Sequence, residues 1–131
     1  MRQELLGLVL LVALGGMLGS VGRYLLVQRV QALAEPSSFP FGTLAVNALG
    51  CAAIGVLGGL AESRGVLTPQ ARAFLVTGAL GGFTTFSAFG FETVALAERG
   101  SLGGALTNVA LQLGFGIGGV WAGYQLIRSL G

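Results

Sequence analysis

The stretch GALGGFTTFSAFGFE, residues 78–92, lies within a long apolar run and yet contains residues that interrupt a helix. Gly81 and Gly82 are adjacent, and Thr84 and Thr85 follow them closely. Adjacent glycines and β-branched residues propagate a helix poorly. A break leaves backbone groups unpaired, which is costly in hydrocarbon unless the break is buried in protein or lines a cavity. The stretch therefore predicts a broken membrane helix with a site at the break.

Outward from this stretch, charged residues divide the chain into four uncharged runs. Only 9% of the 131 residues are charged, whereas a soluble domain has roughly 25%. Each run has the length of about 20 residues that a membrane helix needs. We therefore expect an all-α integral membrane protein, a single domain over residues 1–131. Its four transmembrane helices are predicted at approximately 4–28, 41–62, 70–98 with a break near 81–85, and 101–128.

The arginines give almost no bias in membrane orientation. With four helices, one side holds four arginines and the other side three. The positive-inside rule then predicts either one orientation set by a slight excess, or insertion both ways up and an antiparallel, dual-topology homodimer. Charge alone leaves both open. The two sets are Arg2, Arg64, Arg72 and Arg128 on one side, and Arg23, Arg29 and Arg99 on the other.

Glycines four residues apart favour close packing between membrane helices. Their spacing is specific for packing and not for any chemistry. The pairs are residues 15 and 19, 55 and 59, 114 and 118, and 119 and 123.

Phenylalanines recur every third residue through the break. Phe83, Phe86, Phe89 and Glu92 would share roughly one face of a helix. The edge of a phenylalanine ring is electropositive, so such a row could line an anion path, although a packing stripe is the plainer interpretation. Glu92 could equally be a solvated residue near the membrane interface.

Other polar residues in the spans are few. Asn47, Asn108 and Gln112 either mark a pathway or join helices by hydrogen bonds. Arg23 either supplies positive charge at a mouth or anchors the first helix at the interface. Amide and hydroxyl donors without a deep acid favour an anion. Metal-ligand clusters and nucleophile–base pairs are not apparent, so the sequence gives no support for an enzyme.

Three motifs together resemble the fluoride channel family Fluc, also called CrcB. They are GSVGRY at 19–24, GTLAVNALG at 42–50 and the third-helix stretch at 78–92, in that order. The resemblance covers essentially the whole chain. It implies a dual-topology homodimer with two fluoride pores and a central structural sodium ion.

The resemblance also implies roles for individual residues. Backbone carbonyls of Gly81 and Thr84 would hold the sodium ion. Asn108 and Gln112 align less clearly with the family's fourth helix. The fluoride pore would use Phe86 and Phe89 for its rings, Asn47 as its asparagine, Arg23 at the vestibule, Ser87 and Thr85 as hydroxyls, and Glu92 beyond the phenylalanines.

The implied function is passive export of cytoplasmic fluoride across a prokaryotic inner membrane. The expected partners are fluoride, sodium, the lipid bilayer and a second copy of the chain, and not nucleic acid. The main alternative is a small multidrug-type exporter, also a dual-topology protein of four helices. That class needs an acid within its first span, and none follows Glu4 there. A structural subunit without transport is the third possibility.

Overall fold

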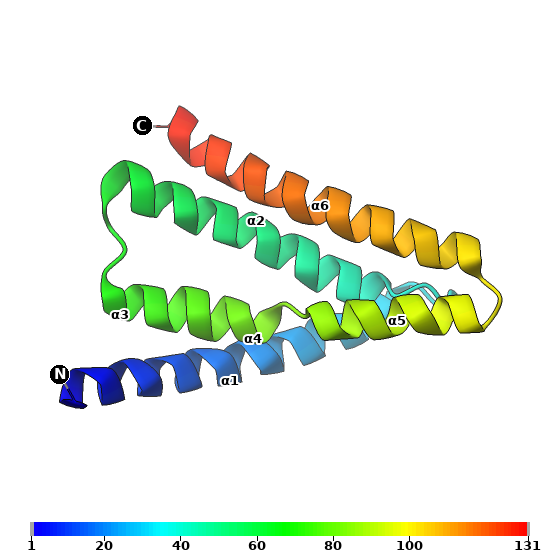
Figure 1. The fold of residues 1–131 in the computed structure, drawn as a ribbon, viewed down its shortest axis with the longest axis horizontal. Helices are drawn as coiled ribbons and strands as arrows, with labels where there is room; N and C mark the ends of the chain where they lie inside the picture. The colour runs from blue at the N-terminus through cyan, green and yellow to red at the C-terminus, as the bar shows by residue number, and fades with distance from the viewer. Residues whose placement is uncertain (1, 131) are drawn as a thin grey trace.

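A computed structural model describes residues 2–130, without the side chain of Arg64, and shows four long helical spans (Figure 1). All four are long and apolar enough to cross a membrane. The prediction of an all-helical protein with four membrane spans is confirmed, and no strand occurs within residues 2–130. The spans are α1 (Arg2–Leu33), α2 (Phe41–Arg64), a composite third span over Pro69–Glu98, and α6 (Leu102–Ser129).

The third span is assembled from four segments. Thr68 caps its start by accepting a hydrogen bond from the Ala71 N–H at 3.1 Å, and a proline occupies the first helical position, as is common. The π-helical segment η1 has wider turns than an α-helix, a form frequent at functional sites. The segments are α3 (Pro69–Ala71), η1 (Arg72–Leu80), α4 (Gly81–Phe83) and α5 (Phe86–Glu98).

The helix breaks at the two threonines. Thr84 has φ −82° and ψ 158°, and Thr85 has φ −152° and ψ 112°, so both are extended. Gly81, by contrast, is helical, with φ −62° and ψ −36°. Gly82 serves close packing, because a Cβ there would lie 2.5 Å from the carbonyl oxygen of Gly16 in α1. The break thus occupies the end of the predicted 81–85 stretch, where β-branched residues follow the glycines.

The helices form two packed pairs that bring distant parts of the chain together. α1 packs along η1 and α4, and α2 packs along α6. Both termini and the α2–α3 connection lie at one end of the molecule, while the α1–α2 and α5–α6 connections lie at the other (Figure 1). α1 continues past Arg23 to Leu33, so Arg23 lies within this helix and does not close it.

Glycines permit the close approach within each pair. A Cβ on Gly19 would collide with the Ala79 carbonyl of η1, and a Cβ on Gly55 would collide with the Val120 carbonyl of α6. Gly114 and Gly118 behave differently, since nothing lies within 4 Å of a Cβ at either position. Within residues 2–130, that predicted pair therefore does not mediate close packing against another helix.

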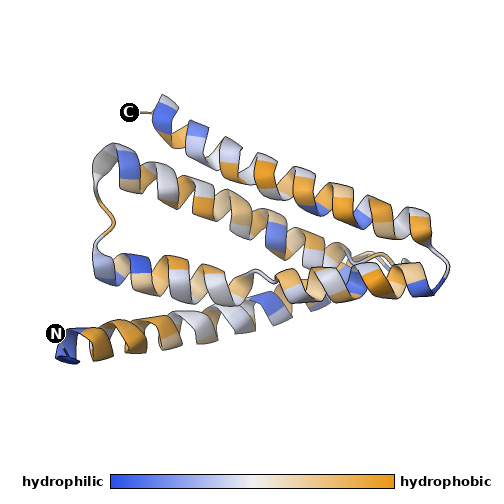
Figure 2. Cartoon of the chain, in the orientation of Figure 1, coloured by the Kyte–Doolittle hydropathy of each residue, from blue (hydrophilic) through white to orange (hydrophobic). Residues whose placement is uncertain are grey.

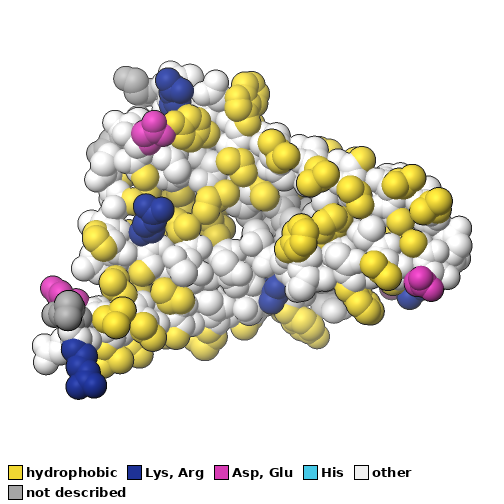
Figure 3. Space-filling model, viewed as in Figure 1, with side chains coloured by type: hydrophobic (Ala, Val, Ile, Leu, Met, Phe, Trp, Pro, Cys, Tyr) yellow, Lys and Arg dark blue, Asp and Glu magenta, His cyan; other side chains and the backbone are white. Residues whose placement is uncertain are grey.

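The distribution of polarity is that of a membrane protein. Figure 2 shows mostly apolar or neutral colours along the spans, and Figure 3 shows hydrophobic side chains over the whole visible face. The buried residues, by contrast, include polar ones: Thr43, Asn108 and Gln112. Polar groups thus gather between the helices, where they find partners, and apolar groups face outward.

Candidate functional site

The side chain of Asn47 holds the break. Its Oδ1 accepts a hydrogen bond from the Thr85 N–H at 2.7 Å, and its Nδ2 donates to the Thr85 carbonyl at 3.0 Å. In a continuous α-helix the Thr85 N–H would donate to the Gly81 carbonyl. Asn47, on α2, therefore satisfies both backbone groups of an extended residue that neither helical segment can satisfy.

Gln112, on α6, completes this amide cluster. Its Oε1 accepts a second hydrogen bond from Asn47 Nδ2, at 3.1 Å. Both N–H groups of the Asn47 amide are then used. The Gln112 side chain is 8% exposed, and its Nε2 has no hydrogen-bond partner among the described residues. The unused amide donor at the break thus belongs to Gln112 and not to Asn47.

A cavity of about 350 Å³ opens beside the break, in the region where the face in Figure 3 is hollowed. None of the described residues in its wall is charged. Apolar residues of α2 and η1 make up much of the lining, and the groups that could meet a ligand are Asn47, Thr84, Thr85, Phe86, Phe89 and Gln112. The cavity therefore combines an uncharged wall with a few polar and aromatic groups close to the break.

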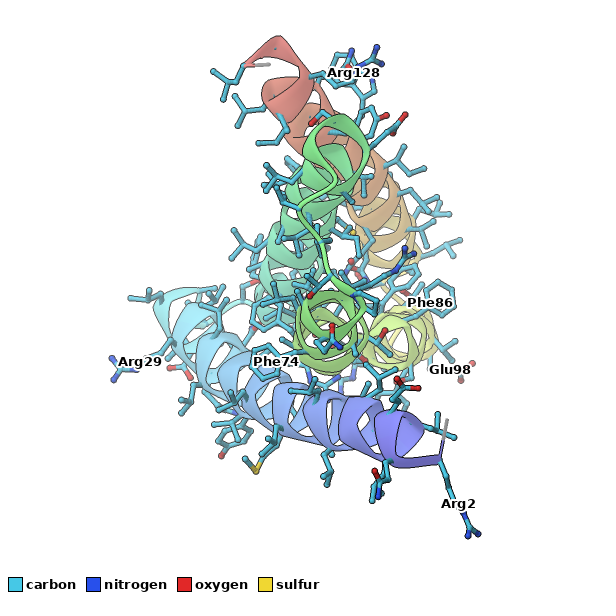
Figure 4. All side chains as sticks on the ribbon, turned by 90° about the vertical axis from the view of Figure 1, so that its left-hand side faces the viewer. Arg2, Arg29, Phe74, Phe86, Glu98 and Arg128 are labelled. Carbon is cyan, nitrogen blue, oxygen red and sulfur yellow. The ribbon has the colours of Figure 1, made fainter. Side chains whose placement is uncertain are left out.

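Two phenylalanines stand at this cavity in an edge-to-face pair. The ring centroids of Phe86 and Phe89 are 5.3 Å apart, and the rings meet at 70°. Phe89 is 9% exposed, whereas Phe86 is 81% exposed and projects outward from α5 (Figure 4). Phe83 does not continue the predicted row, because the break turns its ring towards Gly22 of α1 and Gly50 of α2.

Arg23 reaches the break from α1. Its Nη1 donates to the Thr84 carbonyl at 3.4 Å, and Ser20, one turn earlier, lies 3.5 Å from the Gly82 carbonyl. The guanidinium is therefore directed at the centre of the third span.

The two predicted hydroxyls lie side by side. Thr85 Oγ1 and Ser87 Oγ are 3.2 Å apart. Thr85 Oγ1 also accepts from the Ala88 N–H at 3.2 Å and so caps α5. Ser87 is exposed and does not line the cavity, whereas Thr85 does. The start of α5 therefore presents a helix N-terminus in the middle of the third span.

Glu92 and Asn108 belong to a second polar cluster, away from the cavity wall. Glu92 Oε1 accepts from the Thr43 hydroxyl at 2.6 Å, and Asn108 Nδ2 donates to the Thr93 hydroxyl at 2.9 Å. Glu92 Oε2 and Asn108 Oδ1 have no partner among residues 2–130. These bonds join α5 to α2 and α6, so Asn108 acts as interhelical glue and Glu92 is not simply solvated.

Sequence reasoning left Gln112 and Thr43 without a definite place in the site. Thr43 lies one turn before Asn47 on α2, and that spacing was the available signal for a polar stripe along this helix. Nothing in the sequence indicates that Gln112 bonds to Asn47, because the two lie on different helices. Among the described residues no group of three His, Cys, Asp or Glu side chains could hold a metal ion.

Comparison with known proteins assigns the chain to a family. Residues 10–124 match the family model described as CrcB-like protein, Camphor Resistance (CrcB). A protein of Agrobacterium fabrum named "Fluoride-specific ion channel FluC" is 48% identical over 122 residues, which cover 93% of this chain and 97% of that protein. A protein of the same name from Methylobacillus flagellatus is 42% identical over 120 residues, 92% of this chain and 94% of its own length.

Proposed function

This chain belongs to the CrcB-like family, and from that membership we propose that it is a fluoride channel that conducts the ion passively out of the cytoplasm. The relatives carry the name of an ion channel, so the chain is a multi-pass membrane protein of a channel family and not an enzyme. The proposal includes the direction of flow and location in a prokaryotic inner membrane, since export lowers the toxicity of cytoplasmic fluoride.

The observation that carries the proposal is the uncharged cavity at the break. Fluoride gives up its water only where other donors replace it. The cavity offers the Thr85 hydroxyl and the electropositive ring edges of Phe86 and Phe89. Gln112 also lines the wall, and its Nε2–H, which is buried and unpaired, would have to turn into the cavity to meet the ion. None of these is a fixed cation, so the ion can be bound and then released. A channel needs this balance between binding and release.

The start of α5 supports anion passage further. The first N–H groups of a helix lack partners within the helix, and the N-terminal end carries a partial positive charge. Thr85 places that end beside the cavity. Asn47 acts mainly by holding the extended backbone there, because its amide is already fully bonded to Thr85 and Gln112.

A second copy of the chain would complete the pore. Phe86 leaves most of its ring uncovered by its own chain, and the cavity that it lines is not enclosed by that chain. The proposal is an antiparallel homodimer with two pores, each pore using rings from both subunits. The weak arginine bias, which gives little preference for one orientation, is compatible with that arrangement.

A structural sodium ion at the dimer centre is the last part of the proposal. Gly81 and Thr84 would hold it through backbone carbonyls, which suit a hard cation. The Gly81 carbonyl fits, because the Thr85 N–H that would occupy it in a helix is bonded to Asn47. The Thr84 carbonyl accepts one long hydrogen bond from Arg23, at 3.4 Å, and keeps a second lone pair. Bound there, sodium would fix the crossing of the two breaks.

Fluoride efflux from liposomes that contain the purified protein tests the function. Phe86→Ile removes the ring edge at the cavity. The matched control is Phe91→Ile, because Phe91 is on the same helix, is 76% exposed and does not line the cavity. We expect fast fluoride loss with little chloride loss from wild type and from Phe91→Ile, and a large decrease in Phe86→Ile. Absence of fluoride loss from a folded wild-type protein would contradict the proposed function.

A further inference from the structure

A second cavity continues the first towards the end of the molecule. Its volume is about 380 Å³. It shares Ile54 of α2 and Val76 of η1 with the cavity at the break. The two therefore adjoin along one groove between α2 and η1. The groove leads from the break to Glu62, Leu67 and Arg72, at the end where the α2–α3 connection and both termini lie (Figure 1).

Among the described side chains, Arg72 is the only cation in the walls of the two cavities. It is the first residue of η1 and is exposed. Within residues 2–130 its guanidinium has no hydrogen bond or ion pair. The charge of an exposed side chain acts on passing ions without binding them tightly.

The one acid among the described residues of the same wall, Glu62, is bonded to α6. Glu62 Oε2 accepts a hydrogen bond from the hydroxyl of Tyr124 on α6. Arg128 in turn lies over the Tyr124 ring, with its guanidinium carbon 5.8 Å from the ring centroid. Glu62 is therefore engaged by α6, and the described side chains of Glu62, Arg72 and Arg128 carry a combined charge of +1.

We propose that this outer cavity is the anion-gathering mouth of the path to the break, and that Arg72 raises the local fluoride concentration there. The inference rests on the proposed function. A cleft with one sign of charge and low-dielectric walls concentrates the matching counter-ion. Arg72 acts at a distance and through water, so it increases the rate of access without a binding site of its own. The negative charge of Glu62 at the same mouth lowers the local fluoride concentration.

The expected size of the effect is modest and depends on salt. A unit charge about 8 Å from an anion, with the dielectric constant of water, changes the anion's local concentration about twofold. Salt screens this: the Debye length is about 30 Å at 0.01 M and about 8 Å at 0.15 M ionic strength. If Arg72 concentrates fluoride, its charge variants should differ in efflux rate at low ionic strength. This difference should decrease as salt is added.

The experiment measures fluoride efflux from proteoliposomes at low and at high ionic strength for a series of charges at one site. Arg72→Lys keeps the charge, Arg72→Gln removes it and Arg72→Glu reverses it. Glu62→Gln removes the opposing charge and can still accept the Tyr124 hydrogen bond. Arg99→Gln is the matched control, because Arg99 follows α5 at the opposite end and lines neither cavity.

We expect efflux at low salt to decrease about twofold in Arg72→Gln and further in Arg72→Glu, and to increase in Glu62→Gln. Arg72→Lys and Arg99→Gln should match wild type, and all differences should shrink at high salt. Equal rates across the series, or changes that salt does not reduce, would overturn the inference. If an Arg72 variant does not fold, Glu62→Gln tests the inference by itself. Its fluoride efflux at low salt should exceed that of wild type. A wild type that conducts no fluoride would contradict the proposed function instead.

Discussion

The amide of Asn47 pairs with both backbone polar groups of Thr85, in the manner of a short piece of β-ladder between a side chain and the main chain. This pairing replaces the helical hydrogen bonds that the break removes. Since an unpaired backbone group within a membrane costs several kcal/mol, Asn47 makes the broken helix possible.

Substitution of Asn47 should therefore damage both structure and transport. Asn47→Asp keeps the acceptor for the Thr85 N–H but replaces the donor that faces the Thr85 carbonyl and Gln112. We expect fluoride efflux to fall at least about tenfold, together with a loss of about 1–3 kcal/mol of stability for the unpaired carbonyl. Liposome efflux and thermal unfolding in detergent measure the two effects. Unchanged stability would show that the pairing does not support the break.

Gln112 should matter to transport more than to folding. Gln112→Leu has a similar volume and removes the unused Nε2 donor together with the acceptor for Asn47. Hydrogen bonds to charged groups contribute about 1.5–3 kcal/mol, so we expect fluoride efflux to fall about tenfold or more.

The control for Gln112→Leu is Asn108→Leu on the same helix. Asn108 is fully buried and bonded to Thr93, but it does not line the cavity. The Asn108→Leu variant should have a lower melting temperature than wild type. Its folded fraction should keep the wild-type rate of fluoride efflux. If only Asn108→Leu lost efflux, the amide that fluoride needs would lie in the cluster of Glu92 and Asn108 and not at Gln112.

Packing between α2 and α6 should tolerate no side chain at Gly55. A Cβ there collides with the Val120 carbonyl, so Gly55→Ala should destabilise the protein by about 1–3 kcal/mol through overpacking. Gly118→Ala is matched in chemistry and lies on α6 with nothing within 4 Å of the new Cβ. Thermal unfolding in detergent should separate the two variants. Equal melting temperatures would mean that α2 and α6 can move apart at little cost.

Removal of sodium tests the proposed ion at the break. Dialysis into a large organic cation should lower fluoride efflux, because the carbonyls of Gly81 and Thr84 would then lack the charge that holds them together. Restored sodium should restore the rate. Efflux that does not depend on sodium, measured after the same dialysis, would contradict the ion's structural role while leaving the channel function standing.

Much of the fold could be predicted because it depends on local sequence. Uncharged runs of suitable length predict the four spans, and the threonines after Gly82 predict the break. The first helix was predicted to pass Arg23 and end near residue 28, and it continues to Leu33. Its sequence did not indicate the partner of Arg23, which is the Thr84 carbonyl of the third span.

The site was less accessible to prediction because it depends on contacts between helices. The row of Phe83, Phe86 and Phe89 assumes one continuous helix, and the two extended threonines rotate Phe83 out of it. The bond between Asn47 and Gln112 joins residues that are far apart in the chain. Residue spacing along one helix carries no information about such a bond.

The position of Arg23 has a consequence for how the membrane voltage acts on the protein. Its guanidinium meets the Thr84 carbonyl near the middle of the third span. A cation at that depth is stable only beside water or protein dipoles. Water admitted to this depth carries the bulk electrical potential inward, so the voltage would fall across only part of the bilayer thickness. An ion that crosses the break would then experience a steep electric field over a short distance.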